Sequence, residues 1–465
     1  MNFTIQNVLI ATDNAYLTLD VQVIDGKIAA IAPDLDVVGN TIDGSNKLLL
    51  PGFFNAHTHS SEMWQRGIMS MLPLELWLGE LYDFAPLDLE KVYLSALGTA
   101  VETLLSGGTS VVDHLVLTPG VELETIAAAV RAYEEVGIRA FIAPLIQDQS
   151  LSAGIPGGES NQNSTYFRST AATLEIIEEA VRQFHRPEAG ISIVVAPTGI
   201  QLCSDSLFIG CIELSDRHHL CRHSHLLETK AQEKLAQEKY GCTAVEHLQR
   251  IGYLSDRTSL AHCVWLNDND ITILAQTQCT VVHNPLSNLR LGSGIAPILK
   301  YLQAGVNVSF GCDGASSNDS QDLLEAIKIG SILHNTTDLD YRNWITPRKS
   351  VEMASLGGAK GLKVADKLGS LTLGKQADLV MYDLTSLSLL PRTDPIGLLV
   401  LGRPINVVHS AWVNGKQIVS NGQVNTIKVD DLRQELFKRS QWETQRKSPT
   451  VAEIETHYRQ VMDII

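Results

Sequence analysis

The order of apolar and polar residues first indicates a small β unit at the start of the chain. Residues 4–10 and 15–24 alternate between apolar and polar side chains, a pattern that is typical of half-buried strands. Asp25-Gly26 separates the second run from a third at residues 27–31, and Asp-Gly favours a two-residue hairpin turn. We therefore expect residues 1–50 to form short antiparallel strands.

From residue 51 to residue 364, apolar runs of strand length alternate with amphipathic runs of helical period, such as residues 123–136, 171–184 and 231–251. Eight such alternations favour a closed (β/α)8 barrel over an open sheet. The active sites of these barrels lie at the carboxyl ends of the strands. The predicted strands end at His59, His114, Leu145, Thr198, His225, Val264, His283 and Asp313.

Strand-like patterns return in residues 365–428, where Asn414-Gly415 predicts a second hairpin. We expect these strands to pack with those of residues 1–50 in one β-sandwich domain. Residues 429–465 are charged and amphipathic, and Pro449 divides them into two predicted helices. The predicted fold class is thus α/β: a TIM-like (β/α)8 barrel of residues 51–364, a small β-sandwich from both chain ends, and C-terminal helices.

Composition narrows the functional classes. The formal net charge is −16 without a Lys/Arg-rich run, which argues against a nucleic acid or an anionic membrane as partner. The first residues lack a signal-peptide pattern and no apolar run is long enough to cross a bilayer, so we expect a cytoplasmic protein. The seven cysteines include no Cys-x-x-Cys pair and are expected to be reduced thiols.

Two histidines near the start of the predicted barrel suggest half of a metal site. His57 and His59 are two residues apart, so in a strand both imidazoles face the same side. A catalytic zinc-type ion takes three protein ligands from nitrogen or oxygen atoms and leaves one position for water. Chance also produces His-x-His pairs, so this motif needs partners elsewhere in the chain.

Such partners stand at the ends of other predicted strands. His225 ends the fifth strand, His262 lies in the sixth, and Asp313 ends the eighth. Glu228 follows His225 by three residues, so it shares the face of His225 only if the chain has already turned at the strand end. Each residue alone is more often structural, but their joint position at four strand ends predicts one metal-dependent site.

The sequence resembles the amidohydrolase superfamily, and most closely the branch of S-adenosylhomocysteine/methylthioadenosine deaminases, guanine and cytosine deaminases, and triazine hydrolases. The resemblance extends over nearly the whole chain. The matching motifs are PGFFNAHTH at 51–59, HSHLLET at 223–229, AHCVWL at 261–266, HNPLSNLRLGSGIAP at 283–297, GCDG at 311–314 and GKQADLVMYD at 374–383.

The resemblance implies that His57, His59, His225 and Asp313 are metal ligands. Relatives with two metal ions carry a carboxylated lysine on the fourth strand, whereas residues 191–198 contain no lysine. We therefore expect one divalent ion, with Zn²⁺ favoured and Fe²⁺ or Mn²⁺ suiting the same ligands almost as well.

The resemblance also implies catalytic roles for Asp313, Glu228 and His262. A bound metal ion lowers the pKa of its water from about 15.7 toward about 7, which supplies hydroxide at neutral pH. Asp313 would accept the proton of the water, Glu228 would protonate the ring nitrogen, and His262 would polarise the attacked group. Ammonia or another leaving group then departs.

His283, Asn288, Trp77 and His114 are candidate substrate contacts, each weighed against a packing or loop-supporting role. Nucleoside-deaminating relatives commonly have histidine where this chain has Thr198, and residues 82–87 show no carboxylate in a Pro-Ile-Glu setting that would bind a ribose. These departures favour a free base, a triazine-like ring or a small guanidine-bearing metabolite over a nucleoside.

We therefore predict a hydrolytic deaminase of an aminated N-heterocycle, such as a purine, pyrimidine or triazine-like ring. One alternative is hydrolysis of other C–N or C–Cl bonds, as in triazine dechlorination or the opening and closing of cyclic amides. The other is a binding protein without catalysis. The expected partners are a small-molecule substrate and a second copy of the chain in a homodimer.

Overall fold

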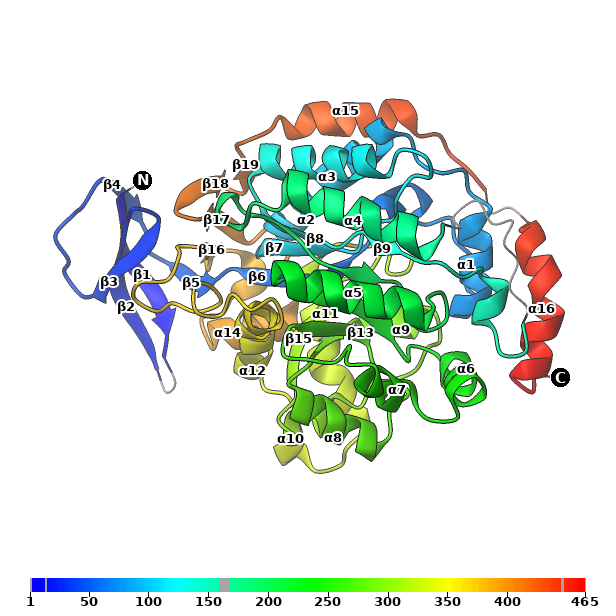
Figure 1. Ribbon diagram of the computed structural model, residues 1–465. Helices are drawn as coiled ribbons and strands as arrows, with labels where there is room; N and C mark the ends of the chain where they lie inside the picture. Colours follow the sequence, from blue (N-terminus) through cyan, green and yellow to red (C-terminus); the bar gives the residue numbers. More distant parts are fainter. Residues whose placement is uncertain (1, 13–14, 159–167, 445–446, 465) are drawn as a thin grey trace.

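The computed structural model describes residues 2–12, 15–158, 168–444 and 447–464 (Figure 1). In these residues, both chain ends contribute to one mixed sheet, while the middle of the chain forms parallel sheets with intervening helices. Figure 1 shows β1–β4 projecting at one end of the molecule and the C-terminal helix α16 at the opposite end.

The mixed sheet has nine strands, and the antiparallel pair β5–β16 joins its N-terminal and C-terminal parts. Both predicted hairpin turns are confirmed: Asp25 and Gly26 have φ of 50° and 75°, and Asn414 and Gly415 have φ of 50° and 72°. The strands pair in one sheet, and a division into two packed layers stays a prediction. The sheet order is β19 (Gln423–Val424), β18 (Lys416–Ser420), β17 (Val408–Val413), β16 (Leu379–Asp383), β5 (Lys47–Pro51), β1 (Phe3–Ala11), β2 (Tyr16–Ile24) and β3 (Lys27–Ala32), with β4 (Asn40–Asp43) paired to β1.

The parallel strands lie at all eight predicted positions and form two four-stranded sheets with a short two-stranded extension. Backbone bonds connect the sheets: His223 N–H donates to Val195 O at 2.9 Å, and Asp313 N–H donates to His57 O at 2.9 Å. The first sheet holds β6 (Phe53–Thr58), β7 (Gly108–Asp113), β8 (Arg139–Ile142) and β10 (Ile191–Ile193), the extension β9 (Leu145–Ile146) and β11 (Ala196–Pro197), and the second sheet β12 (Arg222–Leu226), β13 (Thr258–His262), β14 (Thr280–His283) and β15 (Asn307–Phe310).

Helices connect successive parallel strands and bury their apolar faces in the core. The expected single helical run of residues 231–251 is wrong, because Gly241 ends the first helix with φ of 65° and Thr243 begins a second one with a capping box to Glu246. The main helices are α1 (Leu74–Tyr82), α2 (Leu89–Leu105), α3 (Glu122–Val136), α4 (Thr170–Phe184), α5 (Asp205–His218), α6 (Lys230–Tyr240), α7 (Ala244–Arg250), α8 (Asp268–Thr277), α9 (Pro285–Arg290), α10 (Ile298–Gln303), α11 (Leu323–Ile332), α12 (Pro347–Glu352), α13 (Gly358–Gly361) and α14 (Pro395–Gly402).

The C-terminal segment forms the two helices that Pro449 predicts, α15 (Val429–Arg439) and α16 (Pro449–Val461). Tyr458 of α16 is buried against Leu76 of α1 and Ala231 of α6, so the end of the chain packs behind α1. Figure 1 shows α16 beside α1. None of the helices in the described ranges has the length and apolarity needed to cross a membrane.

Candidate metal centre

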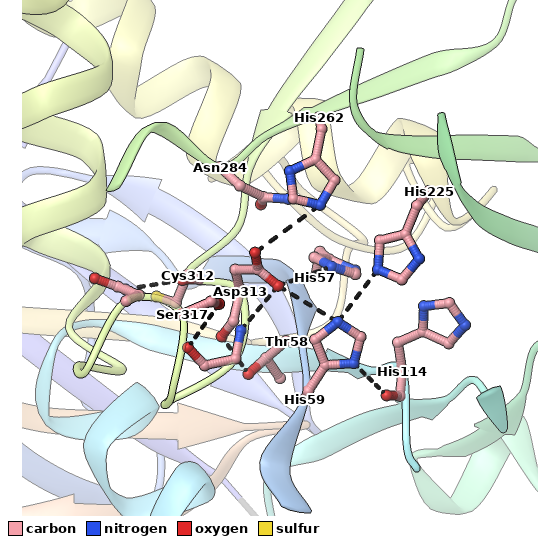
Figure 2. Close-up of polar contacts among 12 residues, drawn as sticks. His57, Thr58, His59, His114, His225, His262, Asn284, Cys312, Asp313 and Ser317 are labelled. Carbon is pink, nitrogen blue, oxygen red and sulfur yellow. Dashed lines mark hydrogen bonds and ion pairs between the residues drawn. The ribbon is translucent and has the colours of Figure 1, made fainter. Parts of the chain in front are cut away.

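Three imidazole nitrogens and one carboxylate oxygen converge where β6, β12 and β15 end (Figure 2). The Oδ1 atom of Asp313 lies 3.2 Å from Nε2 of His57 and 3.4 Å from Nε2 of His59. The Nε2 atoms of His59 and His225 are 3.2 Å apart. Ligand atoms around a tetrahedral ion at about 2.1 Å are separated by about 3.4 Å, so these spacings match one small divalent cation.

The other ring nitrogen of each histidine faces a neighbouring polar group. Nδ1 of His59 lies 2.6 Å from the His114 carbonyl oxygen, and Nδ1 of His225 lies 2.7 Å from the Thr198 carbonyl oxygen. Carbonyl oxygens only accept hydrogen bonds, so both Nδ1 atoms carry hydrogen and both Nε2 atoms keep a free lone pair. This is the tautomer that metal ligation requires.

His57 provides a further test of whether the site fits a cation. Its Nδ1 atom is 2.8 Å from Nε2 of His223, whereas its own Nε2 atom is fully buried and has no hydrogen-bond partner. That Nε2 atom instead faces the Asp313 carboxylate. When Nδ1 of His57 carries the hydrogen, its Nε2 atom and the Asp313 oxygen are both acceptors, and a cation between them satisfies both, so the donor set fits a metal ion.

The charge states of three ligands favour ligation, whereas at His59 burial acts to lower the pKa but the carboxylates of Glu62 and Asp313 raise it. Burial lowers the pKa of His57 and of His225 well below the usual value, so both are neutral at pH 7. Burial acts to raise the pKa of Asp313, but its hydrogen bond to His57 and the nearby histidines hold that pKa well below the usual range. Neutral imidazoles and an anionic carboxylate are the forms that bind divalent metals.

Glu228 and His262 lie next to this cluster. Nε2 of His262 is 3.4 Å from Glu228 Oε2 and 3.9 Å from Asp313 Oδ2. Burial raises the pKa of Glu228 to about 7, against the lowering effect of His262. The chain does turn before Glu228: β12 ends at Leu226, and Leu227 has φ of 44°.

A cavity of about 160 Å³ opens above the cluster and reaches Glu228, His262 and Asp313. Most of its wall is apolar, with α1 forming one side. The apolar lining includes Leu74, Trp77, Leu81, Phe84, Leu117 and Ile146. Of the four predicted substrate contacts, Trp77 lies in this wall.

The other three predicted contacts lie behind the cavity wall rather than in it. Asn288 faces Nδ1 of His262 through its Oδ1 atom at 2.8 Å, and His283 lies 3.1 Å from His334 through their Nε2 atoms. Nε2 of His114 is 3.2 Å from the Ala196 carbonyl oxygen. Each of these three side chains therefore contacts a neighbouring protein group instead of the cavity.

Sequence reasoning missed Glu62, which is buried and lines the same cavity. Burial raises its pKa to about 7, although His59 acts to lower it. Glu62 stands three residues after His59, the same spacing that separates Glu228 from His225. That repeated spacing past two histidine-bearing strand ends was the available signal.

Residues 48–418 match the model of the amidohydrolase family. The chain belongs to the amidohydrolase family. It is therefore a hydrolytic enzyme that acts on C–N bonds, and the predicted resemblance to this family is confirmed. The match covers all the parallel strands and the residues that converge at their ends.

Curated relatives of this amidohydrolase cover most of its length. A 5-methylthioadenosine/S-adenosylhomocysteine deaminase of Thermococcus sibiricus is 33% identical over 404 residues, which is 86% of this chain and 89% of that protein. A 5'-deoxyadenosine deaminase of Methanopyrus kandleri is 32% identical over 403 residues, which is 85% of this chain and 86% of that protein.

Solved structures agree with the family assignment. The zinc complex of an atrazine chlorohydrolase from Arthrobacter aurescens TC1 has a TM-score of 0.87 and 26% identity, covering 94% of this amidohydrolase and 99% of that chain. An adenosine deaminase from Xanthomonas campestris with bound zinc has a TM-score of 0.84 and 25% identity. The match covers 94% of this amidohydrolase and 97% of that chain.

Proposed function

We propose that this amidohydrolase is a mononuclear, zinc-dependent deaminase of an aminated N-heterocycle. The observation that carries the proposal is the convergence of His57, His59, His225 and Asp313, with Glu228 and His262 beside them in the lining of one cavity. The names of the relatives, which include deaminases and a zinc-bound hydrolase of a triazine, support the same chemistry.

The ligand set supports one ion. The fourth parallel position, β10 with its extension β11, provides no lysine that could bridge two metals. When bound, a divalent metal supplies Lewis-acid activation of water at neutral pH. Zinc is favoured because it binds imidazole nitrogen and carboxylate oxygen and can expand from four to five ligands to hold a water beside these four side chains.

The residues around the ligands divide the proton transfers between them. The second oxygen of Asp313, Oδ2, faces His262, so Asp313 can accept the proton of the attacking water while His262 orients that water. Glu228, which titrates near neutral pH, delivers a proton to the ring nitrogen beside the attacked carbon. The apolar wall excludes bulk water from this exchange.

The cavity favours a substrate with an apolar substituent. Its wall carries Trp77 and several leucines, and Thr198 lines it at the position where nucleoside-deaminating relatives have histidine. Asp88, the carboxylate that follows Pro86-Leu87, caps α2 by accepting from Lys91 N at 2.8 Å and does not line the cavity. An alkylated base or triazine is therefore favoured over a substrate recognised through a ribose diol.

We also infer that the parallel strands close into the predicted (β/α)8 barrel. The backbone bonds from His223 to Val195 and from Asp313 to His57 support closure on both sides. Closure would explain how ligands from the first, fifth and eighth strands reach one point.

The decisive experiment measures ammonia release by the zinc-loaded protein over a panel of aminopurines, aminopyrimidines and aminotriazines. Release from at least one ring, and its loss in Glu228→Gln with zinc still bound, is the expected result. Chloride release from a chlorotriazine in the same panel would instead favour dechlorination, which the likeness to atrazine chlorohydrolase makes the second candidate. No turnover of any member by zinc-replete protein would contradict both.

A further inference from the structure

Glu62 is a buried carboxylate in the cavity that the proposed proton transfers leave unused. It lies in the 3-10 helix η1 (Ser60–Gln65), directly after the ligand pair of β6, and only 5% of its surface is exposed. It lines the cavity together with His59 and Asp313. Its interactions with His59 and Asp313 and its contact with Gly314 place it beside the cluster.

Hydrogen bonds from the protein occupy only part of the acceptor capacity of the Glu62 carboxylate. The Ser316 hydroxyl donates to Oε2 at 2.7 Å, and the Ser316 backbone adds a second interaction. Across the described ranges, no lysine or arginine forms an ion pair with Glu62. An ionised carboxylate offers about four acceptor positions, so Glu62 retains capacity for donors from a bound molecule.

The structure holds Glu62 firmly in this position. The Asp113 carboxylate accepts from Ser60 N at 2.9 Å, from Ser60 Oγ at 2.6 Å and from Tyr133 OH at 2.8 Å, which anchors the start of η1. The Glu62 carboxylate packs over Gly314, where a Cβ atom would lie 1.7 Å from Oε2. An acceptor fixed in this way is preorganised for a ligand donor.

We propose that Glu62 is a specificity residue that accepts a hydrogen bond from a second N–H or NH₂ group on the substrate ring. Because Glu62 lies beside His59 and Asp313, it would meet the ring itself rather than a distant substituent. The substrate class is thus an N-heterocycle with a donor besides the amine that is replaced, as in a diaminopurine or a polyaminotriazine. This inference rests on the proposed deaminase function.

Matched substrate pairs test the inference. One pair is 2,6-diaminopurine and 6-amino-2-(dimethylamino)purine, and the other is 2,4-diamino-1,3,5-triazine and 2-amino-4-(dimethylamino)-1,3,5-triazine. Each pair differs in a single donor group. In Glu62→Met, kcat/KM for the donor-bearing member should fall about 10- to 100-fold, as expected for loss of a charged hydrogen bond, while the dimethylamino member is unaffected. Glu62→Gln should give a smaller loss, because its amide oxygen still accepts.

Glu75→Gln is the matched control, because Glu75 is also a buried carboxylate, bonded to the Thr229 hydroxyl, but does not line the cavity. It should leave the preference within each pair unchanged. Dissociation constants for both pairs, measured in the Glu228→Gln background, should show the same loss with Glu62→Met in the absence of turnover. Zinc content is measured for every variant.

The outcomes separate the two proposals. Ammonia release by the wild-type protein combined with an equal loss for both members of a pair would overturn the role of Glu62 alone, since the residue would then only hold the loop at Ser316. Absence of ammonia release from every ring in the panel would overturn the deaminase function itself.

Discussion

His57 and His223 form a buried imidazole pair, with Nδ1 of His57 2.8 Å from Nε2 of His223. Nδ1 of His223 lies 2.7 Å from the Ser259 hydroxyl, so a chain of hydrogen bonds connects β6, β12 and β13. This chain holds the His57 ring in place with its Nε2 atom toward Asp313.

His223→Gln should therefore weaken zinc binding about 10- to 100-fold, as is typical when a partner of a metal ligand is removed. Competition with a chelator measures the affinity. His334→Gln serves as the control, since His334 is buried against His283 and contacts none of the four ligands. Equal zinc affinity in wild type and His223→Gln would contradict this role.

Removing the metal should abolish activity and lower the melting temperature. Metal that binds only the folded state stabilises it by about 2.7 kcal/mol at a free concentration 100 times the dissociation constant. Dialysis against a chelator, followed by Zn²⁺, Fe²⁺ or Mn²⁺, tests which ion restores turnover and thermal stability. A chelated protein that keeps full activity would refute metal dependence.

The rate should decline as the pH rises above about 7. Burial raises the pKa of Glu228 to about 7, so its protonated, proton-donating form is present below that pH and is lost above it. Glu228→Gln should reduce kcat/KM by about 10²- to 10⁴-fold and remove this basic limb. Measuring kcat/KM against pH for the wild-type protein and for Glu228→Gln tests this prediction. If the decline above about pH 7 persists in the variant, another group causes it.

Asn288 should act through His262. Its Oδ1 atom accepts from Nδ1–H of His262 at 2.8 Å and so sets the orientation of that ring. Asn288→Ala should lower kcat about tenfold, because small misplacements of a catalytic group cost up to about 10²-fold, while zinc content stays unchanged. If the zinc content of the variant fell about tenfold as well, Asn288 would instead be needed to hold the metal ion.

Arg139 and Asp378 connect the parallel strands to the mixed sheet through a buried ion pair. The Nε atom of Arg139 lies 3.0 Å from Asp378 Oδ2, and both side chains are less than one-tenth exposed. Asp378→Ala should lower the free energy of unfolding by about 3–5 kcal/mol, because it leaves a buried, unpaired guanidinium. Denaturant unfolding measures the loss, and Asp268→Ala, at an exposed pair with Lys300, should show almost none.

Local sequence determined much of the fold and of the site. Asp25-Gly26 and Asn414-Gly415 specify their hairpins because both residues of such a turn need positive φ. Pro449 begins α16 because its missing N–H costs nothing in the first turn of a helix. Each of these depends on neighbours within a few residues, as does the His-x-His spacing of β6.

Only the tertiary structure decided which side chains face the cavity. His262 and Asp313 have φ of 72° and 63°, so the backbone departs from strand geometry at both residues. The alternation of side-chain faces along a strand therefore cannot predict where these two side chains point. Glu62 lies in the cavity wall because η1 follows directly after β6, whereas His283, the last residue of β14, does not line the cavity. The pairing of β5 with β16 likewise joins residues more than 300 positions apart, and long-range packing, not local pattern, selects such partners.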